Sequence, residues 1–455
     1  MIALGLDIGT SKICVTVIDS NSGKCLESFN TANDTFISIN NKTTRMQDAS
    51  AIKNKAYNLV NLALDKYKEV ECIGVTGQMH GIVYLKNDFS IASPLFTWQD
   101  DSGDMIYKDS DISYAAMLTQ QTGYRMASGF GLTTLYYHKN NNIDYNADYI
   151  ATIHGYIACC LADFDKITLH SSDAHSLGLY DLKNNKFDEE ALKKAGISKN
   201  ILPHVVNFPV ILGRYKGKIP VCVAIGDNQA GFIGSGCDDD ILVNIGTGSQ
   251  LSFKTALNHA DISNMEIRPL SGNSHIFVGA SLCGGRAFAI LKDFYEDVIK
   301  MAGLPIPSDM YGFMLLNTLG TTSSSAVIFS TLFCGTRKDP SLKACISNLT
   351  ADNFTASNLT YATLKGIIDE LYFMFSEAKK IDTKKRQRLI GSGNGIRKNP
   401  ILKKILEETF AMPLFVPINT EEAAYGAALY ALTATGHFKT IEQAQNIIRF
   451  EGNNE

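Results

Sequence analysis

The 455-residue sequence lacks the features that define several large classes of protein. Its formal net charge is −4 and charged residues make up 19% of it, so it has no basic excess of the kind that binds nucleic acid. No apolar run approaches the ~18 residues that a membrane span requires. The N-terminus has no signal-peptide pattern. The sequence therefore predicts a cytoplasmic protein that binds neither nucleic acid nor membranes and has a small-molecule partner.

Familiar nucleotide and metal motifs are also absent. The ten cysteines contain no Cys-x-x-Cys pair, which indicates reduced thiols. No Gly-x4-Gly-Lys-Ser/Thr stretch occurs, and no Gly-x-Gly-x-x-Gly follows a predicted strand. A nucleotide site in this chain must therefore be built from other turns.

One such turn occurs twice, in Leu4–Ser11 and again in Leu242–Ser249. Each copy has an apolar strand, an Ile-Gly-Thr sequence and a second alternating strand, which predicts a β-hairpin. Glycine allows close approach of a ligand, and hydroxyl and N–H groups can bind phosphate. One copy alone would indicate an ordinary turn. Two copies predict one ATP, with phosphate contacts from Gly9, Thr10, Ser11, Lys12, Gly246, Thr247 and Gly248.

The first copy has Asp7 where the second has Asn244. A single carboxylate beside a phosphate chain suits one bound magnesium ion, because Mg²⁺ takes one or two carboxylates together with substrate phosphates. Asp7 is therefore the predicted metal ligand.

The duplicated turn and the chain length together predict two domains, residues 1–236 and 237–455. The first half has predicted strands at 2–8, 13–19, 24–29 and 70–75 and a helix at 51–67, and this mixture predicts an α/β domain. The second half repeats the strands at 241–255 and 276–280. Helices are predicted from 285, over 361–378 and over the alanine-rich segment 421–433.

Asp227 lies where a predicted strand gives way to a helix, beside Asn228. A carboxylate there could accept the proton of a substrate hydroxyl that attacks the γ-phosphate of ATP. The alternative is a helix N-cap, a position that favours Asp.

Two further segments carry candidate binding residues. Trp98, the only tryptophan, lies beside Gln99 and Asp100, and could cover the apolar side of a sugar; the alternative is a core or edge residue. His80 lies in a glycine-bracketed turn after a strand, and a buried core histidine is the alternative. The segment Gly391–Gly395 would leave a flat surface for adenine, or form a plain loop.

Taken together, these segments resemble the FGGY carbohydrate kinases over nearly the whole chain. The resemblance implies an α/β fold of two ribonuclease-H-like (actin-like ATPase) domains with a catalytic cleft between them. It implies that Asp227 is the catalytic base. It also implies substrate-binding roles for Gln78, Met79, His80, Trp98, Asp100, Asp227 and Asn228, and nucleotide-binding roles for Gly391, Gly393, Asn394 and Asn399 in addition to the two phosphate turns.

Within the family, Thr97–Asp100 and Ala127–Gly131 are most similar to the kinases of the seven-carbon ketose sedoheptulose, with xylulose and other pentulose kinases as close rivals. Relatives commonly have Gly-Arg after the aspartate equivalent to Asp100, whereas this chain has Asp101-Ser102. The resemblance implies ATP- and Mg²⁺-dependent phosphorylation of the terminal ketose hydroxyl, and it allows a homodimer. A non-catalytic ATPase scaffold and a sugar sensor are the alternatives from other classes.

Overall fold

The computed structural model describes residues 1–39, 42–236, 238–262, 264–321, 327–336 and 339–452. The chain forms two compact units. Unit 1 comprises Met1–Gly236, Arg268–Ser274 and Glu421–Arg449, and unit 2 comprises Cys237–Ile267, His275–Thr420 and Phe450–Glu455. The sequence placed everything after residue 236 in one domain. Two later segments instead pack with unit 1, so the second domain is not one continuous piece of chain.

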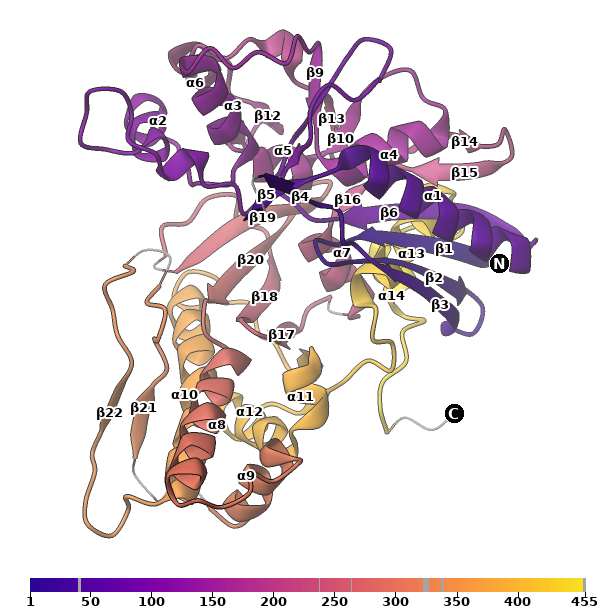
Figure 1. The fold of residues 1–455 in the computed structure, drawn as a ribbon. Helices are drawn as coiled ribbons and strands as arrows, with labels where there is room; N and C mark the ends of the chain where they lie inside the picture. Colours follow the sequence, from indigo (N-terminus) through magenta and orange to yellow (C-terminus); the bar gives the residue numbers. More distant parts are fainter. Residues whose placement is uncertain (40–41, 237, 263, 322–326, 337–338, 453–455) are drawn as a thin grey trace. The chain divides into compact units, whose positions relative to one another are not determined.

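A mixed sheet forms the core of unit 1 (Figure 1). Strand β6 (Val70–Gly77) runs parallel to β1 (Ile2–Ile8), which is the first strand of an antiparallel series β1-β2-β3. The remaining strands of this sheet are β2 (Lys12–Asp19), β3 (Lys24–Ala32), β14 (Ile211–Tyr215), β15 (Ile219–Cys222) and β16 (Ile225–Gly226). The alternating apolar residues of β1 and β2 are buried, as their pattern predicted.

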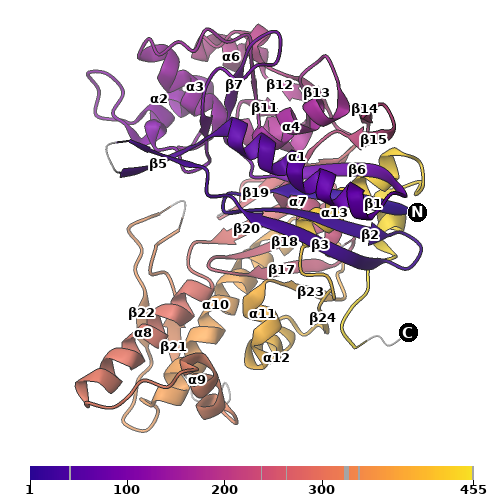
Figure 2. The same ribbon diagram turned by 45° about the vertical axis from the view of Figure 1, so that its right-hand side comes forward.

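Helices α1 (Ala49–Lys66) and α13 (Glu422–Ala434) pack against this sheet (Figure 2). Helix α13 approaches the strands closely because they carry glycine at the contact. A Cβ atom at Gly5 would lie 1.7 Å from the carbonyl oxygen of Ala424, and one at Gly74 would lie 1.9 Å from that of Ala427. Gly426 of α13 makes a similar close approach to α7 (Asp227–Gly234). The last long helix of the chain therefore fixes both the central strands and α7.

The rest of unit 1 consists of short strands and helices. A small sheet joins β4, β5 and β8, and two-stranded sheets join β7 with β9, β10 with β13, and β11 with β12. Their bounds are β4 (Phe36–Ile39), β5 (Lys42–Gln47), β7 (Val83–Leu85), β8 (Leu95–Phe96), β9 (Tyr149–Ala151), β10 (Thr168–His170), β11 (Tyr180–Asp181), β12 (Lys186–Phe187) and β13 (His204–Val206). The helices are α2 (Tyr114–Thr122), α3 (Gly131–Asn140), α4 (Ile153–Ala162), α5 (Ser171–Leu177), α6 (Glu189–Ala195), α14 (Ile441–Gln445) and the 3₁₀ turns at Ser102–Asp104 and Lys199–Ile201.

Unit 2 repeats the strand pattern of unit 1. The second sheet, whose strands belong to unit 2 except for Arg268–Ser271 of β19 and Ser274 of β20, has the order β19-β20-β18-β17-β23-β24, in which β17, β18 and β20 are antiparallel and β23 is parallel to β17. These strands are β17 (Ile241–Ile245), β18 (Ser249–Thr255), β19 (Met265–Ser271), β20 (Ser274–Ser281), β23 (Leu389–Ser392) and β24 (Leu414–Phe415). The predicted duplication is therefore present in the topology as well as in the turns.

Helices and a hairpin complete unit 2. Helix α10 (Ala356–Lys379) packs on β18 and beside the hairpin of β21 (Ile328–Ser330) and β22 (Cys345–Ser347) (Figure 1). The other helices are α8 (Gly285–Met301), α9 (Met310–Thr318), α11 (Asn394–Lys398) and α12 (Pro400–Phe410). Among the helices of the described ranges, none is long and apolar enough to cross a membrane.

Candidate active site

Two carboxylates flank the carboxyl end of β6 in unit 1. Asp7 pairs with Thr76 on one side, and Gly226 pairs with Gly77 on the other, so that Asp227 lies one residue past the end of β16. The carboxyl ends of parallel strands meet at one edge of a sheet, which is where α/β proteins place ligands. Asp227 is the first residue of α7 but is not its cap, because Gly226 is the N-cap and no side chain caps this helix. The N-cap interpretation of Asp227 is therefore wrong.

Burial changes the proton affinity of both carboxyls. It raises the pKa of Asp227 to about 6, against the lowering effect of the nearby His154 and Arg268. Burial also raises the pKa of Asp7 to about 7, and the negative charges of Asp227 and Glu421 add to the effect. Asp7 Oδ1 is buried and makes no hydrogen bond to any described residue. The charged carboxylate form of both groups is thus destabilised, and binding of a cation or a proton would relieve this.

A buried histidine–aspartate pair, which no local sequence pattern indicated, lies near these carboxylates. His154 Nε2 and Asp173 Oδ1 are 2.7 Å apart, and both side chains are fully buried. Burial opposes the charged imidazole, but the carboxylates of Asp173, Asp227 and Asp7 outweigh it and raise the pKa of His154. A Cβ atom at Gly77 would lie 3.0 Å from the His154 Cβ, which places His154 beside the end of β6. The site therefore holds an imidazole whose proton affinity is increased by its carboxylate neighbours.

Helix α5 connects the turn before Asp227 with the turn that carries His80. Ser172 Oγ accepts a hydrogen bond of 3.0 Å from the Gly226 amide, and Ser176 Oγ accepts one of 3.1 Å from the His80 amide. The Ser176 carbonyl lies 2.8 Å from His80 Nδ1. His80 has a φ of 72°, an unfavourable value for a residue with a side chain, so these bonds hold it in a strained conformation. Its ring stacks on Phe130 with centroids 4.8 Å apart.

The other predicted sugar residues differ in exposure. Trp98 is 48% exposed, which excludes the core interpretation, whereas Met79 is only 4% exposed. A Cβ atom at Gly226 would lie 2.6 Å from Met79 Sδ, so Met79 packs under the turn before Asp227. Asp100 Oδ1 accepts hydrogen bonds from the Ser102 amide and hydroxyl and from Thr134 Oγ1. Asn228 Oδ1 accepts one of 3.4 Å from Arg268 Nη1.

A cation does lie beside the loop of Trp98, although no arginine follows Asp100. Arg45 of β5 donates from Nη1 to the Gln99 carbonyl at 3.0 Å and lies 3.2 Å from Asp101 Oδ2. Thr97 Oγ1 donates to the Arg45 carbonyl at 2.7 Å. The sequence could not reveal this contact because Arg45 is distant from the loop along the chain.

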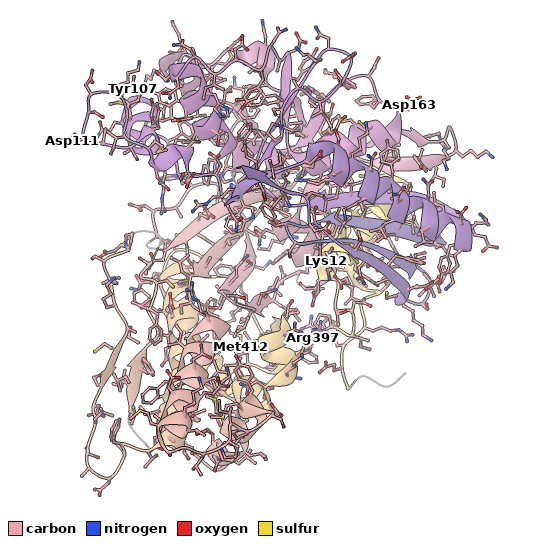
Figure 3. All side chains as sticks on the ribbon, viewed as in Figure 1. Lys12, Tyr107, Asp111, Asp163, Arg397 and Met412 are labelled. Atoms are coloured by element: carbon pink, nitrogen blue, oxygen red, sulfur yellow. The ribbon has the colours of Figure 1, made fainter. Side chains whose placement is uncertain are left out.

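The first phosphate turn directs its carbonyl groups into the protein. The Gly9 and Ser11 carbonyls accept from the side chain and the amide of Asn33, at 2.8 and 2.9 Å, and the Thr10 carbonyl accepts from Gln47 Nε2 at 2.9 Å. This arrangement fixes the backbone of a turn whose amides can bind anions. Lys12 extends from the turn (Figure 3) and contacts both Glu421 carboxylate oxygens, at 2.7 and 2.8 Å.

Thr10 connects the phosphate turn with two of the predicted sugar residues. Its Oγ1 donates to Gln78 Oε1 at 3.2 Å and accepts from Trp98 Nε1 at 3.0 Å. The Thr10 hydroxyl hydrogen, predicted to bind a phosphate oxygen, is therefore used inside the protein.

In unit 2 the second turn is fixed in the same manner. The Gly246 and Thr247 carbonyls accept from the amides of Gly285 and Arg286 at the start of α8, at 2.9 and 3.0 Å. The Gly248 carbonyl accepts from the Gly246 amide at 2.9 Å. Gly246 and Thr247 are exposed, and a Cβ at Gly246 would meet nothing within 4 Å. The tip is thus rigid and open.

The predicted adenosine turn lies beside this tip because β23 and β17 are parallel neighbours. Gly393 has a φ of 85°, and a Cβ there would lie 2.6 Å from the Ile245 carbonyl. Asn394 is exposed at the start of α11. Asn399 is buried, and its Oδ1 caps α12 by accepting from the Leu402 amide at 3.0 Å. Arg397 (Figure 3) holds α11 by donating to the carbonyls of Pro417 and Asn419.

The described residues contain no group of three or more His, Cys, Asp or Glu side chains that could hold a metal ion by themselves. Asp7, with an orphaned buried oxygen, fits a cation that takes most of its ligands from water and phosphate. Such a donor set suits Mg²⁺ bound together with a nucleotide.

The chain belongs to the FGGY family of carbohydrate kinases. The model of the N-terminal domain of that family matches residues 2–239, and the model of the C-terminal domain matches residues 326–435. The protein is accordingly a carbohydrate kinase that uses ATP, and the predicted family and enzyme class are confirmed.

The individual relatives share only low sequence identity with this chain. A sedoheptulokinase of Homo sapiens is 24% identical over 95% of this chain and 97% of its own, and a xylulose kinase of Staphylococcus xylosus is 23% identical over 97% and 92%. Solved structures of a gluconate kinase and a xylulose kinase from Lactobacillus acidophilus match with TM-scores of 0.84 and 0.83, each at 19% identity. These two matches cover 99% and 98% of this chain, and 92% of each solved chain. They confirm the two-domain α/β fold.

Proposed function

We propose that this kinase transfers the γ-phosphoryl group of ATP to the terminal hydroxyl of a ketose, with sedoheptulose as the preferred substrate. One observation carries the proposal. A half-buried carboxyl with a pKa near 6, Asp227, lies at the same sheet edge as a phosphate turn that is hydrogen-bonded to two sugar-binding candidates, Gln78 and Trp98.

Asp227 is proposed to be the catalytic base. Its pKa of about 6 leaves it mostly ionised at neutral pH while keeping appreciable proton affinity, which is the compromise that a general base requires. It would accept the hydroxyl proton as the sugar oxygen bonds to the γ-phosphorus and the bond to the β,γ-bridging oxygen breaks. Protonation of the neighbouring His154 would favour the carboxylate form of Asp227.

Asp7 is proposed to hold Mg²⁺. When bound, the ion would neutralise phosphate charge and lower the proton affinity of Asp7. All contacts to the nucleotide other than that of the Mg²⁺ ion are proposed to come from protein groups. In unit 1, Ser11, Lys12 and the amides of the first turn would bind phosphate. In unit 2, the amides of the second turn would bind phosphate, and the surface of Gly391, Gly393 and Asn394 would bind adenosine.

For Lys12, binding of a phosphate competes with its bidentate contact to Glu421. An ammonium group has three donors, and two of them are used by that carboxylate. We infer that Lys12 either shares its charge between Glu421 and phosphate or leaves Glu421 when ATP binds. Asn399 is buried and caps α12 with its side chain, so we infer that it stabilises the adenosine-binding surface and does not contact adenosine itself.

The sugar is proposed to lie against Trp98, His80 and Asp100. An indole face suits the C–H side of a sugar, and the fixed imidazole and carboxylate can bind hydroxyl groups. We infer sedoheptulose over a pentulose from the loop sequence Thr97–Asp100, which is most similar to the kinases of that sugar. A pentulose such as D-xylulose is the second candidate.

Comparison of kcat/KM for sedoheptulose, D-xylulose, D-ribulose, gluconate and glycerol, with ATP and Mg²⁺ saturating, tests the substrate assignment. We expect sedoheptulose to exceed each other substrate by at least tenfold. A higher value for a pentulose would retain the kinase chemistry and refute the seven-carbon assignment.

A further inference from the structure

Gln47, the last residue of β5, joins the phosphate turn to the sugar-binding turn within unit 1. Its side chain is 0% exposed. Gln47 Nε2 donates to the Thr10 carbonyl at 2.9 Å, and Gln47 Oε1 accepts from Gln78 Nε2 at 2.9 Å. Both ends of a buried amide are therefore used to connect two separate turns. Buried polar groups that are fully satisfied fix a unique geometry and are costly to disturb.

The direction of each hydrogen bond in this group follows from one carbonyl. The Thr10 carbonyl can only accept, so Gln47 must present its NH₂ group to Thr10 and its oxygen to Gln78. Gln78 must then present its own NH₂ group to Gln47 and its oxygen to the Thr10 hydroxyl. The hydroxyl hydrogen is thereby committed, and Thr10 Oγ1 is left as an acceptor. Trp98 Nε1, which can only donate, uses that acceptor.

We propose that Gln47 is a positioning residue that fixes the donor-to-acceptor direction of each hydrogen bond in this network. It thereby holds Gln78 and Trp98 in the orientation that binds the sugar, and it holds the Thr10 turn in the conformation that binds the nucleotide. The inference rests on the proposed function, because it takes Gln78 and Trp98 to be sugar-binding residues. It goes further by making one buried side chain responsible for the affinity of both substrates.

The variant Gln47→Glu tests the proposal because it keeps the size of the side chain and removes its donor. A carboxylate at this position would face the Thr10 carbonyl without an N–H between them, and the network would lose its direction. Trp98 is the only tryptophan of the chain, so fluorescence of the ligand-free protein excited at about 295 nm, where tyrosine absorbs little, reports on this site alone. We expect the emission maximum of the variant to move to longer wavelength and acrylamide quenching to increase.

Gln121→Glu is the matched control. Gln121 belongs to unit 1 and its Oε1 accepts a hydrogen bond of 3.1 Å from the Tyr136 hydroxyl, which a carboxylate would retain. This variant introduces the same charge and should leave the emission of Trp98 unchanged. Thr10→Val removes the acceptor of the Trp98 N–H while Gln47 stays in place, and we expect it to give the same emission change. This variant replaces Gln47→Glu in the test if Gln47→Glu does not accumulate as folded protein.

Kinetics separate positioning from a general loss of structure. In Gln47→Glu we expect KM to rise about tenfold for the ketose and for ATP, since one buried hydrogen bond is lost. A merely structural role would lower the active fraction, and hence kcat, with both KM values unchanged. On the Thr10→Val background, Gln47→Glu should add less than about a twofold effect, because residues in one network are not additive.

The proposal would be overturned if Gln47→Glu folded and had wild-type emission and wild-type KM values. It would also be overturned if the effects of Gln47→Glu and Thr10→Val on KM were fully additive in the double variant. The fluorescence test does not require the correct sugar. If the emission changes as expected but the wild-type protein turns over no ketose, the network stands and the proposed substrate is wrong.

Discussion

Replacement of Asp227 by Asn should abolish most turnover while increasing the stability of the protein at alkaline pH. The amide is nearly the same size as the carboxyl but cannot accept the substrate proton. General base catalysis typically contributes about 10²- to 10⁴-fold, so kcat should fall by that factor. The KM values for ATP and ketose should change little, since the shape of the site is preserved.

The stability effect follows from the pKa of about 6, compared with the ordinary value of 3.8. The folded protein holds this proton more tightly than the unfolded chain does. Wild-type stability is therefore highest below the unfolded pKa and is lost as the pH rises through about 6. A difference of about two pKa units corresponds to roughly 3 kcal/mol, and partial exposure of the side chain reduces this to about 1–2 kcal/mol. Asp227→Asn should thus melt several degrees above wild type at pH 8 and close to it at pH 4.

The assay combines coupled ADP release with thermal melting at several pH values. Wild-type kcat/KM should fall tenfold per pH unit below about 6, because only the carboxylate acts as a base. Asp163→Asn is the control, since Asp163 (Figure 3) is exposed, and Asn tolerates its left-handed φ of 52° equally well. Near-normal kcat in Asp227→Asn, or unchanged melting at pH 8, would refute the role assigned to this carboxyl.

Further predictions concern the metal, the nucleotide, the sugar and the packing of α13. Asp7→Asn should raise the Mg²⁺ concentration for half-maximal activity about tenfold or more, measured by metal titration at saturating ATP; an unchanged value would remove Asp7 as a ligand. Lys12→Ala should raise the KM for ATP with little effect on the KM for ketose, and equal changes in both would contradict a phosphate contact. Trp98→Phe should raise the KM for ketose by more than it lowers kcat, and unchanged constants would make the tryptophan a structural residue. Gly74→Ala should destabilise the protein by at least about 1–3 kcal/mol in thermal melting, since its Cβ would lie 1.9 Å from a backbone oxygen of α13; Gly231→Ala, whose Cβ would meet nothing within 4 Å, should be neutral or stabilising.

Much of the core could be predicted from the sequence because its pattern is local. The predicted strand at 2–8 is β1, and the helix predicted over 421–433 is α13, shifted by one residue. The duplicated turn correctly indicated two related sheets, since each copy begins an antiparallel series and lies beside a parallel strand. Periodicity and turn chemistry act over a few residues, so they can be recognised without the rest of the fold.

The features of the fold that could not be predicted from the sequence depend on contacts between distant segments. Helix α5 was not predicted, because it is only seven residues long and most of its buried residues are polar (Ser171, Ser172, Asp173 and Ser176), with Ala174 and Leu177 as the buried apolar ones. The His154 pair with Asp173 could not be inferred for the same reason. Helix α13 groups with unit 1 because glycines on β1 and β6, more than 300 residues earlier, provide the surface on which it packs.

The candidate site shows both outcomes. The sequence identified Thr10, Gln78 and Trp98 separately, and the structure joins them through hydrogen bonds. The role predicted for the Thr10 hydroxyl changed because its hydrogen is donated to Gln78, which no local pattern could reveal. Arg45 and Gln47, both from β5, were missed because neither belongs to a motif.

Phosphorus NMR of a reaction with ATP, Mg²⁺ and sedoheptulose tests the central claim most directly, because it shows where the transferred phosphoryl group goes. We predict a new phosphomonoester signal that grows in equal amount with ADP in the wild-type protein, and is reduced at least about a hundredfold in rate in Asp227→Asn. Inorganic phosphate formed with ADP and without a phosphomonoester, or undiminished transfer by Asp227→Asn, would contradict the account.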